Sequence, residues 1–316
     1  MSKENTSKKA NAKAYRGVPL STRLWKARYY YLMLLPALAY LIIWKYVPMY
    51  GVQIAFKNFR VSLGIWGSPW VGFRNFTDFF NSFSFKQLIS NTFAISLYSL
   101  IAGFPIPILV ALTLNEIKTK YKNFVQTVLY APHFISTVVL VGIMVSLFSP
   151  SQGVVNTILG SLGIEPIYFF GDPKYFRHLY VWSGVWQGMG WSAIIYLAAL
   201  AGVDMELHEA ADIDGATRLQ KIIYINVPTI LPTVIILLIL QLGKIANVGW
   251  EKVYLMQNDL NVSTAEVIST YVYKRGILGQ SFSFSSAVGL FNNLVNIAML
   301  FISNTISKRV TKTSLF

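Results

Sequence analysis

Long apolar stretches separated by polar segments dominate the hydrophobicity pattern of this 316-residue chain. A helix needs roughly 20 apolar residues to cross a hydrocarbon core of about 30 Å, and six stretches reach that length. We expect transmembrane helices near residues 29–52, 88–114, 125–148, 179–201, 230–250 and 284–306. Uninterrupted apolar runs such as 138–145 argue against the alternating pattern of a membrane β-barrel. The pattern therefore predicts an all-α, polytopic membrane protein.

Proline residues predict irregularities in the first two of these helices. Pro36 and Pro48 lie within or at the end of the first expected span, and Pro105 and Pro107 lie within the second. A proline removes one backbone donor and clashes with the preceding turn of a helix. Both spans should therefore be kinked or broken, as membrane helices can be where neighbouring groups satisfy the freed backbone.

The distribution of charge indicates how the chain is oriented in the membrane. Only 13% of the residues are charged and 54% are apolar, while the formal net charge is +14. With the amino terminus inside the cell, sixteen Lys and Arg residues fall inside and nine outside, while Lys45 and Lys244 lie within or near spans. The positive-inside rule therefore predicts that both termini are cytoplasmic. The expected external loops are residues 57–86, 152–177 and 251–283.

Two short cytoplasmic segments are expected to flank a transmembrane domain at residues 29–306. Residues 1–28 form a basic arm, for which contact with anionic lipid headgroups is favoured over an acidic protein partner. Residues 307–316 form a short tail. Because the positive charge follows the membrane topology, we expect membrane lipid as a partner and no nucleic acid.

The sequence offers little for catalysis. It contains no cysteine, and its three histidines, His133, His178 and His208, are dispersed along the chain. It has no HExxH metal motif and no GxxxxGK[ST] phosphate loop. We therefore expect no catalytic site, no metal site and no cofactor in this chain, which should not itself bind or hydrolyse ATP.

A polar, acid-bearing segment lies between the fourth and fifth expected spans, at residues 204–228. Because a charged side chain at mid-bilayer costs roughly 2.5 to 3.5 kcal/mol, this segment must face water. Residues 207–216 have high helix propensity and should form a short amphipathic helix. Gly215 permits a bend or cap before a second helical stretch that begins at Ala216.

The same segment carries a spaced motif of acidic, alanine, glycine and proline residues. Its members are Glu209, Ala210, Ala211, Asp214, Gly215, Ala216, Ile225, Pro228 and Pro232. This motif resembles the EAA loop of permease subunits from binding-protein-dependent ATP-binding-cassette (ABC) importers, with Val227 where leucine is usual. The resemblance implies a cytoplasmic coupling helix that inserts into a groove on a separate ATPase subunit. It makes Glu209 the charged anchor of that helix and Gly215 its bend.

The order of the six expected spans is similar to that of the sugar-importer permeases related to the maltose system. The resemblance therefore implies the type I ABC importer permease fold. Residues 241–243 and 247–255 look like the subgroup that imports oligosaccharides or polysaccharide fragments. The implied transporter contains a second permease, two ATPase subunits carrying ATP and Mg, and an extracellular sugar-binding protein. Its implied location is the bacterial plasma membrane, which this chain crosses several times.

Polar residues within the expected spans are candidates for lining a carbohydrate path. Gln241, Lys244 and Asn247 have the i, i+3, i+6 spacing that directs them toward one face of the fifth helix. Such a face belongs in a bundle interior or a wet cavity. Hydrogen bonding between helices is an equal alternative for Gln241 and Asn247, and pairing with another subunit is the main alternative for Lys244. Weaker candidates, chosen because aromatic faces and amides suit sugars, are Trp186, Gln187 and Asn293.

Two other functions were weighed against the permease interpretation. A membrane-embedded enzyme needs a cluster of acids or histidines inside the membrane, and the expected spans contain none. A secondary transporter favours inverted repeats and ion-coupling acids, and no clear Asp or Glu lies in the spans. The sequence therefore favours the permease subunit of an ABC importer for an oligosaccharide or polysaccharide fragment.

Overall fold

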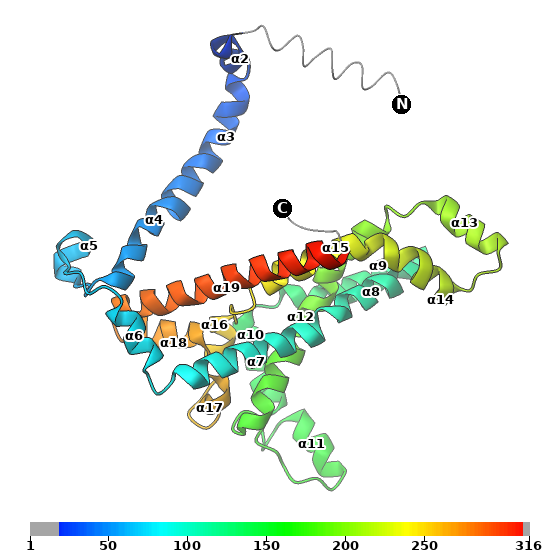
Figure 1. The fold of residues 1–316 in the computed structure, drawn as a ribbon. Helices are drawn as coiled ribbons and strands as arrows, with labels where there is room; N and C mark the ends of the chain where they lie inside the picture. The colour runs from blue at the N-terminus through cyan, green and yellow to red at the C-terminus, as the bar shows by residue number, and fades with distance from the viewer. Residues whose placement is uncertain (1–18, 312–316) are drawn as a thin grey trace.

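Helices account for most of the computed structural model, which describes residues 19–311 (Figure 1). One isolated antiparallel bridge joins Lys57 to Trp70 within this part of the chain. Residues 1–18 of the expected basic arm and 312–316 of the expected tail lie outside the described residues. The all-α fold class is confirmed.

The described helices provide four to six candidate membrane crossings. Four are long and apolar enough by themselves, and two bent helix pairs raise the number to six if each pair is one span. The four single crossings are Arg28–Phe56, Phe85–Glu116, Arg218–Leu242 and Phe282–Arg309. This range agrees with the expectation of about six membrane-spanning helices.

The first span changes helical type along its length. After α2 (Leu20–Lys26), it comprises α3 (Arg28–Leu41), the π-helix η1 (Ile42–Tyr46), α4 (Val47–Met49) and the 3-10 helix η2 (Tyr50–Phe56). The π-turn ends two residues before Pro48, whose missing N–H interrupts the α-helical hydrogen bonds. In Figure 1, α3 stands apart from the other helices. An 18-residue apolar window of this span is 0% buried, so the span makes little use of its own chain for packing.

Proline also sets a boundary in the second span. The chain passes through η3 (Val61–Leu63), α5 (Gly64–Gly67) and α6 (Arg74–Phe80) before α7 (Phe85–Gly103) and α8 (Pro105–Glu116). Pro105 occupies the first position of α8, where a helix leaves its backbone N–H unpaired in any case. The expected break in this span is therefore a junction between two successive helices.

The third span is bent and not continuous, which corrects the expectation of one helix over residues 125–148. It consists of α9 (Thr119–Tyr130), the 3-10 helix η4 (Ala131–Phe134) and α10 (Thr137–Leu147), with a bend of 96° between its two halves. Pro132 lies in η4, and Ser136 starts α10 by accepting a 3.4 Å hydrogen bond from the Val139 backbone N–H. These residues redirect the chain because Pro132 lacks a backbone donor and Ser136 caps the new helix. The short α11 (Val154–Ser161) follows.

The fourth span, α12 (Pro173–Leu200), is the central helix of the bundle and packs against α7, α8 and α9. Gly190 permits a close approach to the third span, since a Cβ atom there would lie 2.1 Å from the carbonyl oxygen of Leu129. The chain then forms α13 (Met205–Ile213), α14 (Arg218–Lys221), the π-helix η5 (Ile222–Asn226) and α15 (Val227–Leu242). Buried side chains of α8, α12 and α15 form one apolar cluster, which includes Ala111, Tyr196 and Ile230.

The fifth helix ends at Leu242, so the expectation that Lys244 and Asn247 extend its helical face is wrong. After Leu242 the backbone forms turns, in which Lys244 N bonds to Gln241 O and Asn247 N bonds to Lys244 O. A Cβ atom at Gly243 would lie 2.7 Å from Leu300 Cδ1, so glycine lets the end of α15 approach the last helix closely. The helix stops where contacts with a distant part of the chain replace its own hydrogen bonds.

Short helices fill the segment between the fifth and last spans. They are α16 (Trp250–Met256), α17 (Val262–Ala265), α18 (Ile268–Tyr273) and the π-helix η6 (Lys274–Leu278), followed by the long α19 (Phe282–Thr311). The last helix therefore continues into the expected cytoplasmic tail as far as Thr311.

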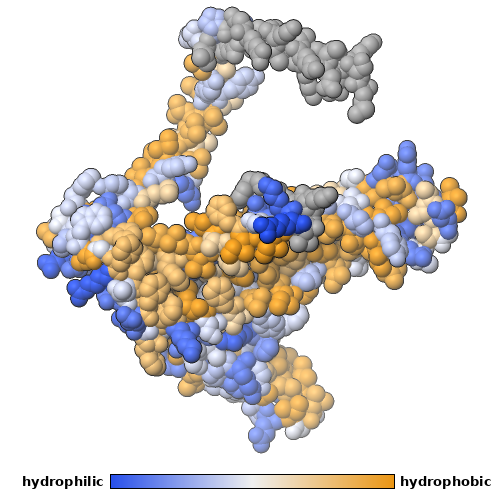
Figure 2. Space-filling model, viewed as in Figure 1, coloured by the Kyte–Doolittle hydropathy of each residue, from blue (hydrophilic) through white to orange (hydrophobic). Residues whose placement is uncertain are grey.

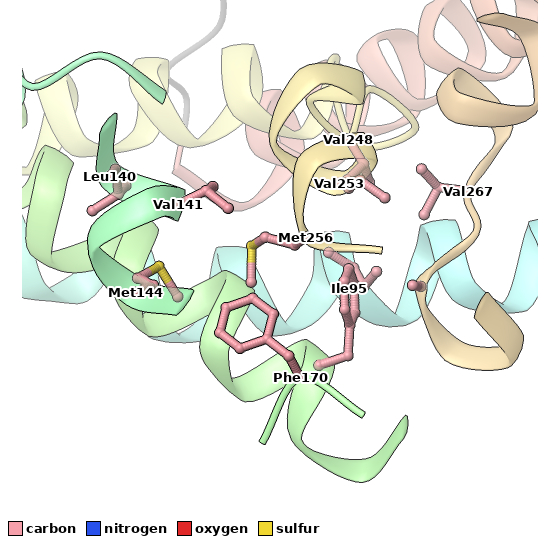
Figure 3. Close-up of a cluster of buried hydrophobic side chains, with 11 residues drawn as sticks. Ile95, Leu140, Val141, Met144, Phe170, Val248, Val253, Met256 and Val267 are labelled. Atoms are coloured by element: carbon pink, nitrogen blue, oxygen red, sulfur yellow. The ribbon is translucent and has the colours of Figure 1, made fainter. Parts of the chain in front are cut away.

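A buried apolar cluster fixes α16 against the second, third and fourth spans (Figure 3). Val253 and Met256 of α16 are 0% and 1% exposed, and they pack with Ile95 of α7 and Met144 of α10. The apolar side chains give α16 a fixed orientation. This orientation places its neighbouring residue Lys252 beside α12.

The surface along the long helices is largely hydrophobic, whereas polar residues gather at the ends of the molecule (Figure 2). In a water-soluble protein such a continuous apolar surface would be unusual. Around a bundle of membrane-spanning helices it is the surface that lipid or another membrane subunit covers.

Candidate coupling segment and translocation path

The segment between the fourth and fifth spans folds as two short helices joined by a glycine turn. Asp204 caps α13 by accepting a 3.0 Å hydrogen bond from the Glu206 backbone N–H. Gly215 ends the helix with φ +73°, and the Ala216 N–H bonds to Ala211 O at 2.9 Å. With the bond from Gly215 N to Asp212 O, this is a Schellman cap, in which glycine is favoured at the left-handed position. Gly215 therefore has the backbone role expected from the sequence.

The second helix of the segment begins at Arg218, two residues later than expected. Thr217 caps α14 through a reciprocal pair, in which Gln220 N donates to Thr217 Oγ1 at 3.4 Å and Thr217 N donates to Gln220 Oε1 at 2.7 Å. Lys221 then bonds to Asp212 of α13 at 2.6 Å. This ion pair ties the two short helices together across the turn.

The motif residues lie on a projecting and mostly exposed surface. Figure 1 shows α13 and α14 at the opposite end of the long helices from α5 and α6. Glu209, Ala210, Asp214, Gly215 and Pro228 are exposed, whereas Ala211 and Ala216 are half-buried. An apolar side chain is also presented here, because Ile213 is 88% exposed. A polar segment with an exposed isoleucine at its tip can supply both a charged and an apolar contact to a partner.

Three adjoining cavities follow α12 through the bundle, and Gln241 lines all three. The first, of about 280 Å³, is lined by Tyr180 of α12 together with Ser96, Gln241, Lys244 and Asn247. These cavities extend along α12 from Tyr180 to Tyr196. At 1.5 Å per residue this is about 24 Å, which is most of the hydrocarbon thickness of a membrane.

The second cavity, of about 310 Å³, holds the amide of Gln187 and the ammonium of Lys252. It shares Ser99, Tyr180 and Gln241 with the first cavity. Gln187 Nε2 donates to Ile135 O at 2.7 Å, and no other bond to its side chain occurs in the described chain. The amide oxygen of Gln187 is therefore available to accept from a ligand hydroxyl. The third cavity, of about 430 Å³, continues past Trp191 and Ser192 to Tyr196.

Asn247 takes part in hydrogen bonding between elements as well as lining a cavity. Its Oδ1 accepts bonds from Asn292 Nδ2 and Asn296 Nδ2, each at 2.9 Å. Asn296 Oδ1 in turn accepts a 2.9 Å bond from the Ala246 backbone N–H. Both α19 asparagines are at least nine-tenths buried, so this network holds the turn after α15 in place. Asn247 therefore makes the hydrogen bonds between elements that were the alternative to a role in lining the path.

Two of the weaker candidates lie away from the first two cavities. Trp186 lines a separate, largely apolar cavity of about 420 Å³ together with Leu140, Trp182 and His178. Asn293 is exposed and lines neither of the cavities that hold Lys244 and Lys252. The two side chains are therefore separated from the polar row around Gln241.

Lys252 is a cavity residue that sequence reasoning placed only in an external loop. Its Nζ donates to Tyr180 O at 2.9 Å and lies 4.8 Å from the centre of the Tyr180 ring. Gly184 makes room for it, since a Cβ there would lie 3.3 Å from Lys252 Nζ. In α16, outside the candidate membrane spans, burial lowers the pKa of Lys252 to about 8. No periodic pattern could have found this lysine, because turns separate α16 from the fifth helix.

Comparisons with known proteins give this arrangement a family. Residues 103–312 match the family described as binding-protein-dependent transport system inner membrane component. Protein LplB of Bacillus subtilis (strain 168) is 43% identical over 304 residues, which cover 96% of each chain. The polygalacturonan/rhamnogalacturonan transport system permease protein YteP of the same organism is 41% identical, covering 92% of this chain and 91% of the relative.

Two solved structures of a bacterial alginate ABC transporter are similar to the whole fold. In a structure of the transporter "involved in the import of the acidic polysaccharide alginate", one chain is 41% identical, with a TM-score of 0.85 over 92% of this chain and 99% of that one. In the complex with an alginate pentasaccharide-bound periplasmic protein, the TM-score is 0.86 at 40% identity, over 94% of this chain and 99% of that one. The family match and these relatives together show that the chain belongs to the binding-protein-dependent transport system inner membrane components and is the permease subunit of an ABC importer.

Proposed function

We propose that this permease pairs with a second permease to form the path for ATP-driven uptake of an oligosaccharide or polysaccharide fragment. The row of cavities along α12 carries the proposal, because it offers amides and hydroxyls over most of a membrane thickness. Sugar hydroxyls both donate and accept, and Gln187, Gln241 and Ser99 supply both kinds of partner. The named relatives, which transport polygalacturonan/rhamnogalacturonan and alginate, support a glycan substrate.

The coupling segment accounts for the energy source. We assign Glu209, Ala210, Ala211, Asp214, Gly215, Ala216 and Pro228 to contact with an ATPase subunit, which carries ATP and Mg. The exposed charge of Glu209 and the exposed side chain of Ile213 fit a groove that is both polar and apolar. Two copies of the ATPase then serve the two permeases, one for each coupling segment.

The first span supports a second membrane subunit. Its apolar window is 0% buried, and α3 leaves the bundle in Figure 1, so the helix has apolar surface that its own chain does not cover. A second permease of similar shape provides a protein surface for that helix. We place α13, α14 and both termini on the cytoplasmic side of the membrane. The other end of the long helices, with α5 and α6, is then external. It faces a binding protein that delivers the sugar.

Reconstitution tests this function directly. The chain is co-expressed with its neighbouring permease, ATPase and binding-protein genes, purified and placed in proteoliposomes. We expect ATP-dependent accumulation of an oligosaccharide only when all components are present. Assembly of the complex with no ATP-dependent uptake of any of a panel of neutral and acidic oligosaccharides would contradict the proposal. The motif variant Glu209→Lys serves as the uncoupled control.

A further inference from the structure

Two lysine side chains line adjoining cavities that Gln241 also lines. Lys244 lines the first cavity and Lys252 lines the second, and the two cavities share Ser99, Tyr180 and Gln241. The lysines come from different elements, the turn after α15 and the helix α16, so a local sequence pattern does not explain their meeting. The fold itself brings two positive charges to one stretch of the path.

Neither charge is neutralised within the described residues. No carboxylate lies within 4.0 Å of the Nζ atom of Lys244 or Lys252 there, and no Asp or Glu lines either cavity. Acidic partners do accompany lysines elsewhere in the chain, as Glu266 does for Lys274 at 3.0 Å. Lys244 is exposed, whereas Lys252 is partly buried, where an unpaired ammonium is costly and where its three donors exceed the single Tyr180 carbonyl that it reaches.

The groups around the lysines are those that bind a sugar acid. The carboxylate of a uronic acid accepts charge-assisted bonds from ammonium groups, while its ring hydroxyls need neutral donors and acceptors. Gln241 has no side-chain hydrogen bond within the described residues, so its donor and acceptor both remain available. Ser99 adds a hydroxyl that faces both cavities. A neutral glycan would use the amides and hydroxyls and leave both positive charges uncompensated.

We infer that Lys244 and Lys252 form a carboxylate-binding site that makes this path selective for acidic glycans. Lys252 is the specificity-determining residue that the fold adds, and Gln241 lines the cavities of both lysines. Successive carboxylates of a uronate chain meet the two ammonium groups as the chain passes along α12. The inference rests on the proposed function and deepens it by assigning the substrate to the anionic class.

A cysteine-protection assay tests this site without the binding protein. The natural chain has no cysteine, so Ser99→Cys introduces one thiol that faces both cavities. The complex with its partner permease and ATPase subunits is alkylated with a small maleimide, and the peptide containing position 99 is followed by mass spectrometry. Tetragalacturonate is titrated as the acidic probe. The same tetrasaccharide with every carboxyl reduced to an alcohol is the neutral control of equal length and linkage.

We expect tetragalacturonate to protect the thiol at about a hundredfold lower concentration than the reduced probe, with about tenfold from each lysine. Lys252→Met and Lys244→Met should each weaken protection by the acidic probe about tenfold, or about 1.4 kcal/mol, because each removes one charge-assisted contact. Protection by the neutral probe should change little. Lys252→Arg should retain the preference, and Lys174→Met, at an exposed lysine outside both cavities, controls for the loss of one charge.

Equal protection by the two probes, protection by neither, or a preference that survives in the double variant overturns the inference. If the Lys252→Met complex fails to assemble, the acidic and neutral probes are compared on Lys252→Gln instead. Lys244→Met, at an exposed side chain, gives the same comparison. A lysine that only pairs with the second permease would lower assembly and would leave the probe preference unchanged in the complex that remains. ATP-dependent uptake in proteoliposomes is measured separately, so a failure of the proposed function is distinguished from a failure of the carboxylate site.

Discussion

His208 Nε2 lies 3.0 Å from Asn226 Oδ1, which links α13 of the candidate coupling segment to the base of the fifth span. Asn226 is 0% exposed, and its Nδ2 has no hydrogen-bond partner. The amide therefore depends on His208 for its one side-chain bond. Together with the Lys221–Asp212 ion pair, this contact ties the projecting segment to the membrane helix behind it.

Replacing His208 by alanine should loosen the coupling helix while leaving the membrane bundle intact. Removing one partner of a buried polar group costs about 1 to 3 kcal/mol, and here the loss falls between α13 and η5. We expect faster hydrogen exchange in residues 205–221 and no change in α19. His133→Ala, at a histidine that stacks on Trp191 in another part of the fold, is the control. Unchanged exchange in residues 205–221 would show that the contact does not restrain the segment.

Replacing Gly215 by valine should abolish recruitment of the ATPase without preventing membrane insertion. A side chain at φ +73° costs about 1 to 2 kcal/mol, and the bulk of a β-branched residue adds to this. Co-purification with the ATPase measures the effect. Gly163→Val introduces the same kind of strain at φ +80° in a segment that we assign to the external side. That variant should retain the ATPase, and equal loss in both would assign the effect to general misfolding.

Replacing Asn296 by leucine should destabilise the bundle, whereas the same change at Asn293 should not. The Asn296 side chain bonds to Ala246 N and to Asn247, while the Asn293 side chain is exposed and makes no hydrogen bond among the described residues. We expect a loss of about 1 to 3 kcal/mol for the buried residue, seen as a lower unfolding temperature of the purified complex. Similar temperatures for the two variants would mean that the turn after α15 is held by other contacts.

The contact between α12 and the third span should make Gly190 much less tolerant of alanine than Gly188. A Cβ at Gly190 meets Leu129 O at 2.1 Å, whereas at Gly188 nothing lies within 4 Å. Forcing atoms into such a space costs about 1 to 3 kcal/mol, while alanine in an open helical position stabilises by about 0.5 to 1 kcal/mol. Thermal unfolding of the two variants should therefore shift in opposite directions.

The proposed orientation can be tested with single cysteines on this cysteine-free chain. Ile213→Cys, at a residue 88% exposed on the coupling segment, should react with a membrane-impermeant maleimide only after the cells are opened. Gly160→Cys on α11, where nothing lies within 4 Å of the added atom, should react in intact cells. The reverse pattern would overturn both the orientation and the assignment of residues 204–228 to an ATPase contact.

Features with a local cause could be predicted from the sequence, and features with a distant cause could not. The cap at Gly215 depends on residues within one helical turn, and the break at Pro105 depends on the missing N–H of that proline. The bend in the third span also has a local signal, Pro132, which the apolar pattern obscured. By contrast, α15 stops at Leu242 beside side chains of α19 about fifty residues later.

The candidate path shows the same division. Gln241, Lys244 and Asn247 line one cavity, as predicted. The reason differs from the prediction, because Lys244 and Asn247 are placed there by turns after α15 and not by a continuous helix. Gln187 joins them across the bundle, whereas Trp186, its neighbour in sequence, faces a different cavity. Lys252 is positioned by the burial of Val253 and Met256 in the apolar cluster. Its place in the path follows from three-dimensional packing that periodicity does not encode.

The detached first helix has a consequence for how the cell makes the subunit. Since the apolar window of Arg28–Phe56 is 0% buried in its own chain, the chain by itself leaves this surface to lipid. Membrane helices insert independently before they associate, so under the proposed pairing the packing of this helix waits for the second permease. With the proposed pairing, the amount of assembled permease is set by the scarcer of the two partners.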